Sequence, residues 1–183
     1  MRAPTAMPGT EPAPLPIVLI GPMGAGKSHV GRKLAARLGV PFVDTDAVIV
    51  ERHGAIEELF ERHGEPGFRE LERRAVAEAI AAPAVVSLGG GAVLHPETRA
   101  ALADATVVFL TVDARAVAPR LRGGTRPLIA EGGIRAWTRI FDERRPLYRE
   151  LADVEVDTTK RTIAQVVGEI ARELGHAGTE TGA

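Results

Sequence analysis

The sequence predicts an α/β domain of three layers, in which helices cover both faces of a parallel sheet of about five strands. Short runs rich in valine and isoleucine alternate along the chain with segments whose apolar residues recur at helical spacing. The apolar runs are nearly continuous, as expected of strands that are buried on both faces. Alternation of this kind through the whole chain is typical of the α/β class.

Five segments are predicted to be strands, because each is short, apolar and bounded by turn-forming residues. They are residues 17–20, 42–43, 84–87, 106–111 and 154–156. Between them, apolar spacing predicts a helix containing Val30, Leu34 and Leu38, a longer one over about 65–81, and a last one near 166–174. Pro96 and Pro146 are interpreted as helix starts or local kinks.

The two ends of the chain differ in composition from the part between them. Residues 1–16 contain five prolines and few residues that could pack, so we expect a disordered leader that is not a secretory signal. Residues 175–183 are expected to form a flexible tail. A single domain is predicted over residues 17–174, and 183 residues are enough for a full-sized core.

Composition excludes several classes of function. The formal net charge is −1, from 23 basic and 24 acidic residues, so no global positive field favours nucleic acid or an anionic membrane. The absence of cysteine excludes disulfides, thiolate metal sites and cysteine catalysis. No apolar stretch approaches the roughly 18 residues that span a bilayer. We therefore expect a cytoplasmic protein without nucleic-acid or membrane partners.

Residues 21–28, GPMGAGKS, match the phosphate-binding pattern G-x-x-x-x-G-K-[ST] at every fixed position. A predicted strand precedes this loop and a predicted helix follows it. Glycines let successive backbone N–H groups surround phosphate oxygens, Lys27 would contact the β- and γ-phosphates, and the Ser28 hydroxyl would bind Mg²⁺. The alternative is a glycine-rich turn with an incidental lysine. The full match favours a site for a nucleoside triphosphate with Mg²⁺.

Asp44 and Asp46 directly follow the second predicted strand. Parallel sheets place ligand groups at the carboxyl ends of their strands. If this segment is extended, both carboxylates point to the same side, toward the phosphate site. One could hold the metal through water, and the other could orient and deprotonate an attacking hydroxyl. In the alternative interpretation, Asp44 only caps a helix that begins near Asp46.

Two further segments are rich in glycine. Residues 87–91, SLGGG, follow the third strand and would let a substrate approach the backbone, although a flexible turn explains them equally well. Residues 122–128, RGGTRPL, precede Gly132 and Gly133, which indicates a mobile lid over about 122–133. Arg126 on such a lid would reach phosphoryl oxygens only on closure. The alternative is a solvated loop.

In this order, GPMGAGKS, FVDTD, GFRELE, SLGGGA, RPL and RRPLY resemble the shikimate kinase family, over residues 17–174. The phosphate loop is shared by many families, whereas the other motifs in this order are much more specific. The resemblance implies a P-loop NTPase fold like that of the nucleoside monophosphate kinases, with a mobile lid. It implies transfer of the γ-phosphoryl group of ATP to the 3-hydroxyl of shikimate, in aromatic amino-acid and chorismate biosynthesis, with MgATP and shikimate as partners.

The resemblance also implies roles for individual residues. Those expected to bind ATP are Gly24, Ala25, Gly26, Lys27, Ser28, His29, Arg126 and Arg161. Those expected to bind shikimate are Asp46, Arg69, Gly90 and Arg144. Mg²⁺ would be held by Ser28 and, through water, by Asp44. Catalysis would depend on Lys27, on Arg126 and on Asp46 as the base.

Some positions depart from the family pattern or leave two candidates open. His29 stands where the family usually has a threonine that contacts the α-phosphate, and an imidazole is bulkier than that hydroxyl. Arg120 and Arg122 are both candidates for the arginine beside adenine. Arg145 adjoins Arg144, and on a helix the two side chains point about 100° apart, so only one can face the site. Spacing to the following proline favours Arg144.

Three alternatives remain open. Arg69 could be an exposed helix residue that pairs with Glu65 or Glu72. The protein could be another kinase of a small hydroxy acid, such as gluconate, although two arginines with Asp46 and SLGGG favour shikimate. It could instead be a regulatory homologue that binds ATP without turning it over, but the presence of Lys27, Asp46 and Arg126 argues against this. The oligomeric state is open, and we favour a monomer.

Overall fold

Five parallel strands form one sheet in the order β2-β3-β1-β4-β5. The computed structural model describes residues 15–121 and 132–175. The strands are β1 (Ile17–Ile20), β2 (Phe42–Asp44), β3 (Val85–Ser87), β4 (Thr106–Thr111) and β5 (Val154–Asp157). All five predicted strands are confirmed, with ends that differ by at most one residue.

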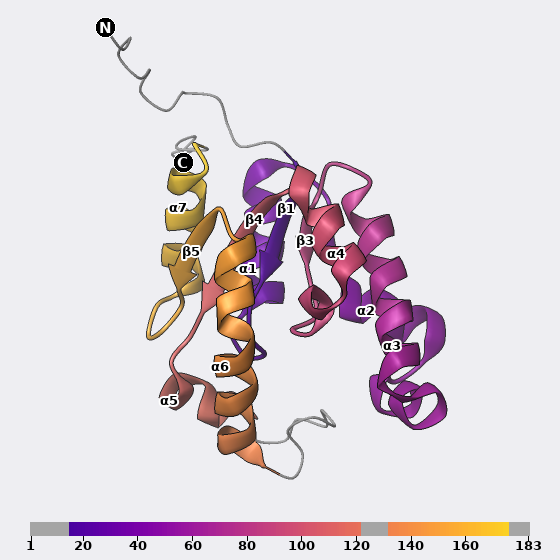
Figure 1. Ribbon diagram of the computed structural model, residues 1–183. Coiled ribbons are helices and arrows are strands. Elements are labelled where there is room, and N and C mark those ends of the chain that lie inside the picture. The colour runs from indigo at the N-terminus through magenta and orange to yellow at the C-terminus, as the bar shows by residue number, and fades with distance from the viewer. Residues whose placement is uncertain (1–14, 122–131, 176–183) are drawn as a thin grey trace, which may run out of the picture.

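Helices cover both faces of this sheet (Figure 1). The helices are α1 (Lys27–Leu38), α2 (Thr45–His53), α3 (Ile56–Ile80), α4 (Pro96–Ala101), α5 (Ala114–Val117), α6 (Gly133–Leu151) and α7 (Ile163–Glu173). Helices α1 and α7 contact each other on one face, while α3, α4 and α6 lie on the other. Residues 92–94, 102–104 and 118–121 form short 3₁₀ turns. The predicted three-layer α/β architecture is confirmed.

Two helix predictions need correction. The helix predicted from about residue 65 is the second half of α3, which begins at Ile56 and is interrupted at Gly64, where φ is 64° and ψ is 179°. Pro146 does not start a helix but lies inside α6, which leaves a local kink as the other predicted possibility. Helix α6 continues through the proline because its apolar face, including Phe141 and Tyr148, is buried, and this burial outweighs the local cost of about 3 kcal/mol. Pro96 does begin α4, as predicted.

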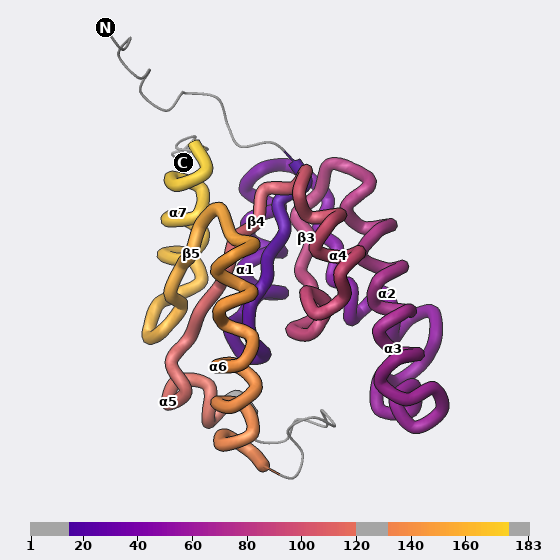
Figure 2. The backbone as a smooth tube through the Cα atoms, in the orientation of Figure 1, coloured from indigo at the N-terminus to yellow at the C-terminus, as the bar shows by residue number. Residues whose placement is uncertain are grey.

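The apolar residues form two separate clusters. The larger cluster surrounds the sheet, and all four residues of β1 are fully buried at its centre. The smaller cluster lies between α2 and α3 and consists of Ile49, Leu59, Phe68 and Ala75. These two helices stand beside the β2 edge of the sheet and project away from it (Figure 2). The α2–α3 unit therefore has an apolar core of its own.

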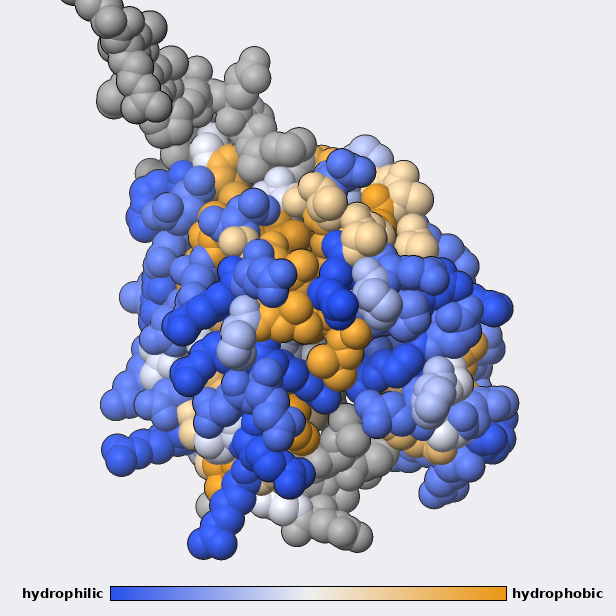
Figure 3. Space-filling view, viewed as in Figure 1, coloured by the Kyte–Doolittle hydropathy of each residue, from blue (hydrophilic) through white to orange (hydrophobic). Residues whose placement is uncertain are grey.

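The surface is mostly polar on the face shown in Figure 3, and the largest gathering of apolar residues lies toward the middle. No helix in the described ranges is long and apolar enough to span a membrane. The leader predicted for residues 1–16 and the tail predicted for 175–183 fall almost wholly outside the described ranges. So does the predicted lid, apart from Gly132 and Gly133, where α6 begins.

Candidate active site

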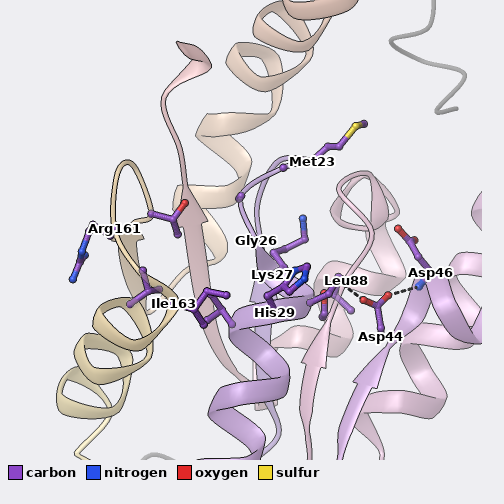
Figure 4. A pocket seen from close by; sticks show the side chains of 16 residues that line it. Met23, Gly26, Lys27, His29, Asp44, Asp46, Leu88, Arg161 and Ile163 are labelled. Carbon is purple, nitrogen blue, oxygen red and sulfur yellow. Dashed lines mark hydrogen bonds between the residues drawn. The ribbon is translucent and has the colours of Figure 1, made fainter. Parts of the chain in front are cut away.

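A cavity of about 540 Å³ lies at the carboxyl edge of the sheet. It is lined by Met23, Gly24, Ala25, Gly26, Lys27, Ser28, His29, Val30, Asp44, Asp46, Ser87, Leu88, Thr158, Arg161, Ile163 and Val166. The register of the strands brings the lining residues of β2 and β3 to the same level of the sheet as the end of β1. Asp44 pairs with Ser87, and Ser87 pairs with Leu19 of β1. Figure 4 shows the loop before α1 at the centre, with Asp46 on one side and Arg161 on the other.

The loop at residues 21–26 adopts the conformation that its glycines permit. Gly21 has φ of 134°, and a Cβ there would lie 2.2 Å from the carbonyl oxygen of Leu110. Gly26 is left-handed, with φ of 90°, at the point where α1 begins. From α6, the indole Nε1 of Trp137 donates to the Met23 carbonyl over 2.9 Å. A neighbouring helix thus holds the loop in place.

Lys27 is the positive charge of this loop. Its side chain is buried, and Nζ donates to the carbonyl oxygens of Gly21 at 2.8 Å and Pro22 at 3.0 Å. The loop carbonyls therefore fix a compact ammonium group at the start of α1. Together with the backbone N–H groups of a helix N-terminus, such a group attracts phosphate.

Asp44 both caps a helix and contacts the loop. Its Oδ1 accepts hydrogen bonds from the N–H groups of Asp46 at 3.1 Å and Ala47 at 3.3 Å. Its Oδ2 accepts a hydrogen bond from the Ser28 hydroxyl at 2.5 Å. The prediction that Asp44 and Asp46 share an extended segment was wrong, because this cap starts α2 at Thr45. Asp46 nevertheless lines the cavity from the first turn of α2.

The glycine triplet at residues 89–91 is surrounded by charged side chains. A Cβ at Gly89 would lie 2.5 Å from Oε1 of Glu72 and 2.6 Å from Oδ1 of Asp46. A Cβ at Gly91 would lie 2.3 Å from Nη1 of Arg69. The glycines leave the space that these groups occupy, so the triplet is more than a flexible turn. Glu72 is buried, and sequence reasoning had considered it only as a partner of Arg69.

Thr45 fixes the position of the triplet. Its side chain is fully buried. Its hydroxyl donates a hydrogen bond to the Ser87 carbonyl and accepts one from the N–H of Gly89, each with a length of 3.3 Å. The start of α2 is thereby bonded to the loop after β3. Thr45 lies between the two predicted aspartates, yet its sequence position gave no sign of this role.

Arg69 is held by two carboxylates. Nη1 contacts Oε2 of Glu72 at 2.6 Å, and Nη2 contacts Oε1 of Glu65 at 3.0 Å. The predicted alternative named both partners, but it expected an exposed arginine, and this side chain is only 12% exposed. Its Nε has no hydrogen-bond partner among the described residues. Burial raises the pKa of Glu72 even though the charge of Arg69 acts in the opposite direction.

Arg144 and Tyr148 approach the triplet from α6. Nη1 of Arg144 donates to the Gly90 carbonyl at 3.2 Å, and the Tyr148 hydroxyl donates to the same oxygen at 2.5 Å. Burial of the Tyr148 phenol raises its pKa to about 12. Arg145 instead pairs with Asp142. Of the two adjacent arginines, it is therefore Arg144 that faces the triplet, and Tyr148 is a contact that the sequence did not reveal.

The far end of the cavity is formed by α7 and the turn before it. Arg161 lines this end, where Nη1 donates to the Asp157 carbonyl at 3.0 Å and Nη2 pairs with Glu169. Ile163 also lines it and is 39% exposed. Sequence reasoning missed Ile163, although its place just after the fifth strand puts it at the same edge of the sheet.

The predicted site residues fall into three groups: some line the cavity, some lie around the glycine triplet, and some lie outside the described residues. His29 lines the cavity, as expected of a residue beside the loop. Arg69, Gly90 and Arg144 do not line it but gather around the glycine triplet, which Asp46 reaches from the cavity side. Arg126 and the rest of the predicted lid at 122–131 lie outside the described residues, as does Arg122, and the side chain of Arg120 is likewise not described.

Comparison with known proteins gives consistent results. The sequence model of the family described as shikimate kinase matches residues 23–175. A curated shikimate kinase of Thermobifida fusca is 46% identical over 164 residues, covering 88% of this chain and 95% of its own. One of Mycobacterium avium is 47% identical over 162 residues, covering 86% and 92%.

Solved structures agree with these sequence relatives. A structure described as shikimate kinase from Acinetobacter baumannii in complex with shikimate superposes with a TM-score of 0.83 at 35% identity, covering 89% of this chain and 94% of its own. A gluconokinase from Sinorhizobium meliloti gives a TM-score of 0.64 at 24% identity, covering 91% and 94%. The second likeness extends to the fold alone.

Proposed function

The chain belongs to the shikimate kinase family, and from this membership we infer that it transfers the γ-phosphoryl group of ATP to the 3-hydroxyl of shikimate. The observation that carries the proposal is the position of Asp46. This carboxylate lines the cavity beside the phosphate loop and also lies against Gly89, next to the cluster of Arg69 and Glu72. We propose that it stands between the site for the phosphate donor and the site for an acidic acceptor.

The phosphate loop would hold the triphosphate. Backbone N–H groups at the start of α1 and the fixed ammonium of Lys27 would neutralise the charge of the β- and γ-phosphates. Arg161 and Ile163 at the far end of the cavity would border the rest of the nucleotide, with the exposed apolar surface of Ile163 available to the base. Phosphoryl transfer needs little covalent chemistry from the protein, so such positioning supplies most of the catalysis.

The residues at the loop suit Mg²⁺. The Ser28 hydroxyl and an Asp44 carboxylate oxygen lie 2.5 Å apart at the cavity wall, and both are hard oxygen ligands of the kind Mg²⁺ prefers. We propose that Ser28 holds the ion directly and Asp44 through water. When bound, Mg²⁺ would neutralise negative charge on the phosphates.

Arg69 and Arg144 would bind the carboxylate of shikimate. Both guanidinium groups lie at the glycine triplet, and we propose that the ring packs against the backbone of Gly90. A planar guanidinium binds a carboxylate through two parallel charge-assisted hydrogen bonds. Asp46 would orient the acceptor hydroxyl and take its proton as the bond to phosphorus forms. Two guanidinium groups beside a carboxylate base favour a hydroxy acid over a nucleotide as acceptor.

Substitution of Asp46 tests this proposal directly. We expect Asp46→Ala to lower kcat by about 10²–10⁴-fold, because the acceptor hydroxyl loses its base, while MgATP binds as in the wild type. ADP release would be measured with shikimate, gluconate and nucleoside monophosphates, and MgATP binding by calorimetry. Asp142→Ala, which removes an exposed carboxylate of α6, is the control. Turnover by Asp46→Ala within a few-fold of the wild type would contradict the role of this residue.

A further inference from the structure

Arg69 is held by two carboxylates that differ in their freedom to move. The Glu72 side chain is only 3% exposed, whereas the Glu65 side chain is 50% exposed. Each occupies a different terminal nitrogen of the same guanidinium, Glu72 on Nη1 and Glu65 on Nη2. One partner belongs to the interior of the site, and the other lies at its surface.

Glu72 is fixed in this pair. Its carboxylate lies against Gly89, beside that of Asp46, and separation from Arg69 would leave it buried without its paired cation. Loss of the partner of a buried charge is strongly unfavourable. Glu72 therefore remains on Nη1 when any ligand approaches, and it keeps the guanidinium oriented.

The Glu65 carboxylate can separate from Arg69 at little cost. It directly follows Gly64, whose backbone interrupts α3, so Glu65 stands in the first turn of the resumed helix. A carboxylate in this position is stabilised by the helix dipole and, here, also by water. An ion pair four residues apart on a helix, whose carboxylate is half exposed to water, contributes little free energy, and its loss on displacement is correspondingly small.

We propose that Glu65 is an internal competitor for the substrate carboxylate, occupying Nη2 of Arg69 until the acid substrate displaces it. This inference rests on the proposed role of Arg69 in substrate binding. If a substrate carboxylate bound Nη2 while Glu65 was still there, two negative charges would lie close together. The substrate carboxylate and Glu65 therefore exclude each other from this nitrogen. Glu65 thus weakens the binding of every acid at Arg69, and the substrate must gain its affinity from further contacts, such as those at Asp46.

The variant Glu65→Gln removes the competing charge and keeps the shape of the side chain. We expect KM for shikimate to fall about two- to fivefold, since a pair of this type corresponds to roughly a factor of two and the like charge adds to it. KM for ATP should stay unchanged. The difference from wild type should shrink in about 0.5 M salt, which screens half-exposed charges. Glu58→Gln, which breaks the exposed pair with Arg62 earlier in α3, is the matched control and should change neither KM.

A second probe separates competition from a structural effect. Shikimate carboxamide must still displace Glu65 from Nη2 but carries no like charge, so its affinity, measured by calorimetry, should rise less in Glu65→Gln than the affinity for shikimate does. An equal gain for the acid and the amide would overturn the inference, as would an unchanged or higher KM for shikimate in Glu65→Gln. If the wild type itself fails to phosphorylate shikimate, the proposed function fails first and this inference with it. Turnover by the wild type without the KM effect refutes the inference alone.

Discussion

Gly89 shows how much of the site depends on a missing side chain. The carboxylates of Asp46 and Glu72 both occupy the space that a Cβ at Gly89 would need. Two acidic groups are thereby brought close to one short stretch of backbone, with Arg69 as the nearby cation. No larger residue would allow this arrangement without moving a carboxylate that the proposed reaction uses.

Gly89→Ala is expected to reduce kcat/KM for shikimate by at least about tenfold, because a methyl group 2.5 Å from Oε1 of Glu72 forces that carboxylate or Asp46 to move. KM for ATP should change little, since the phosphate loop lies on another segment. Steady-state kinetics with each substrate varied would measure the split. Gly168→Ala in α7 is the control, because nothing lies within 4 Å of its added methyl group. Equal effects of both substitutions would contradict the proposed crowding at Gly89.

Contacts of single residues were the part of the site that sequence predicted least well. Lys27, Ser28 and Asp44 were identifiable, because each belongs to a local motif whose spacing fixes its neighbours. Trp137 donates to Met23, which is 114 residues away in the chain, and such a contact depends on how α6 lies against the sheet. Local spacing carries no information on that orientation. The same limit hid the bond from Tyr148 to Gly90.

At the scale of elements, polar side chains decide where helices begin. Asp44 ends β2 and caps α2 in one step, which is why the two aspartates of DTD do not lie on one strand. Strand positions were predictable within a residue, since continuous apolar burial marks them. The first half of α3, before the break at Gly64, was not predictable, because its Leu59 is buried in the small core shared with α2, which depends on how the two helices pack.

Helix α7 begins with a capping box that can be tested. The Thr162 hydroxyl accepts from the N–H of Gln165 at 3.2 Å, and Oε1 of Gln165 accepts from the N–H of Thr162 at 2.9 Å. Thr162→Ala should lower the free energy of unfolding by about 1 kcal/mol, because an N–H group at the helix start loses its partner. Urea denaturation would measure the change. Thr162→Ser keeps the hydroxyl and should lose much less, and identical losses in both variants would show that the cap is not responsible.

For the molecule as a whole, the parallel sheet brings distant motifs to one edge. The loops after β1, β2, β3 and β5 all contribute to the cavity, although they are spread over most of the chain. This convergence follows from the α/β alternation that the sequence displays, so the placement of the motifs was predictable even where their contacts were not. Helix α6 contacts two of these segments, since Trp137 donates a hydrogen bond to the phosphate loop and Tyr148 donates one to the glycine triplet.

The stability of the folded protein should depend on pH in the alkaline range through Tyr148. Its pKa is raised to about 12, while an unfolded tyrosine titrates near pH 10. Between these values the unfolded chain loses the phenolic proton and the folded protein keeps it. The free energy of unfolding should therefore fall as pH rises, by about 1.4 kcal/mol per pH unit from this group.

Absorbance of the phenolate can measure this shift, because Tyr148 is the only tyrosine in the chain. At pH 11 we expect about a tenth of the phenol to be ionised in the folded protein, and about nine-tenths in urea. Tyr148→Phe should show a shallower loss of stability above pH 10. Equal ionisation in the folded and unfolded protein at pH 11 would contradict the burial of this hydroxyl as the cause.

The bond between Trp137 and the Met23 carbonyl also has a practical consequence. Trp137 is the only tryptophan in the chain, and its indole lies in the interior against the phosphate loop. Indole emission responds to changes in its immediate polar surroundings. The unlabelled protein thus contains an optical probe at the loop, by which the occupancy of that loop can be followed in real time without a coupled assay.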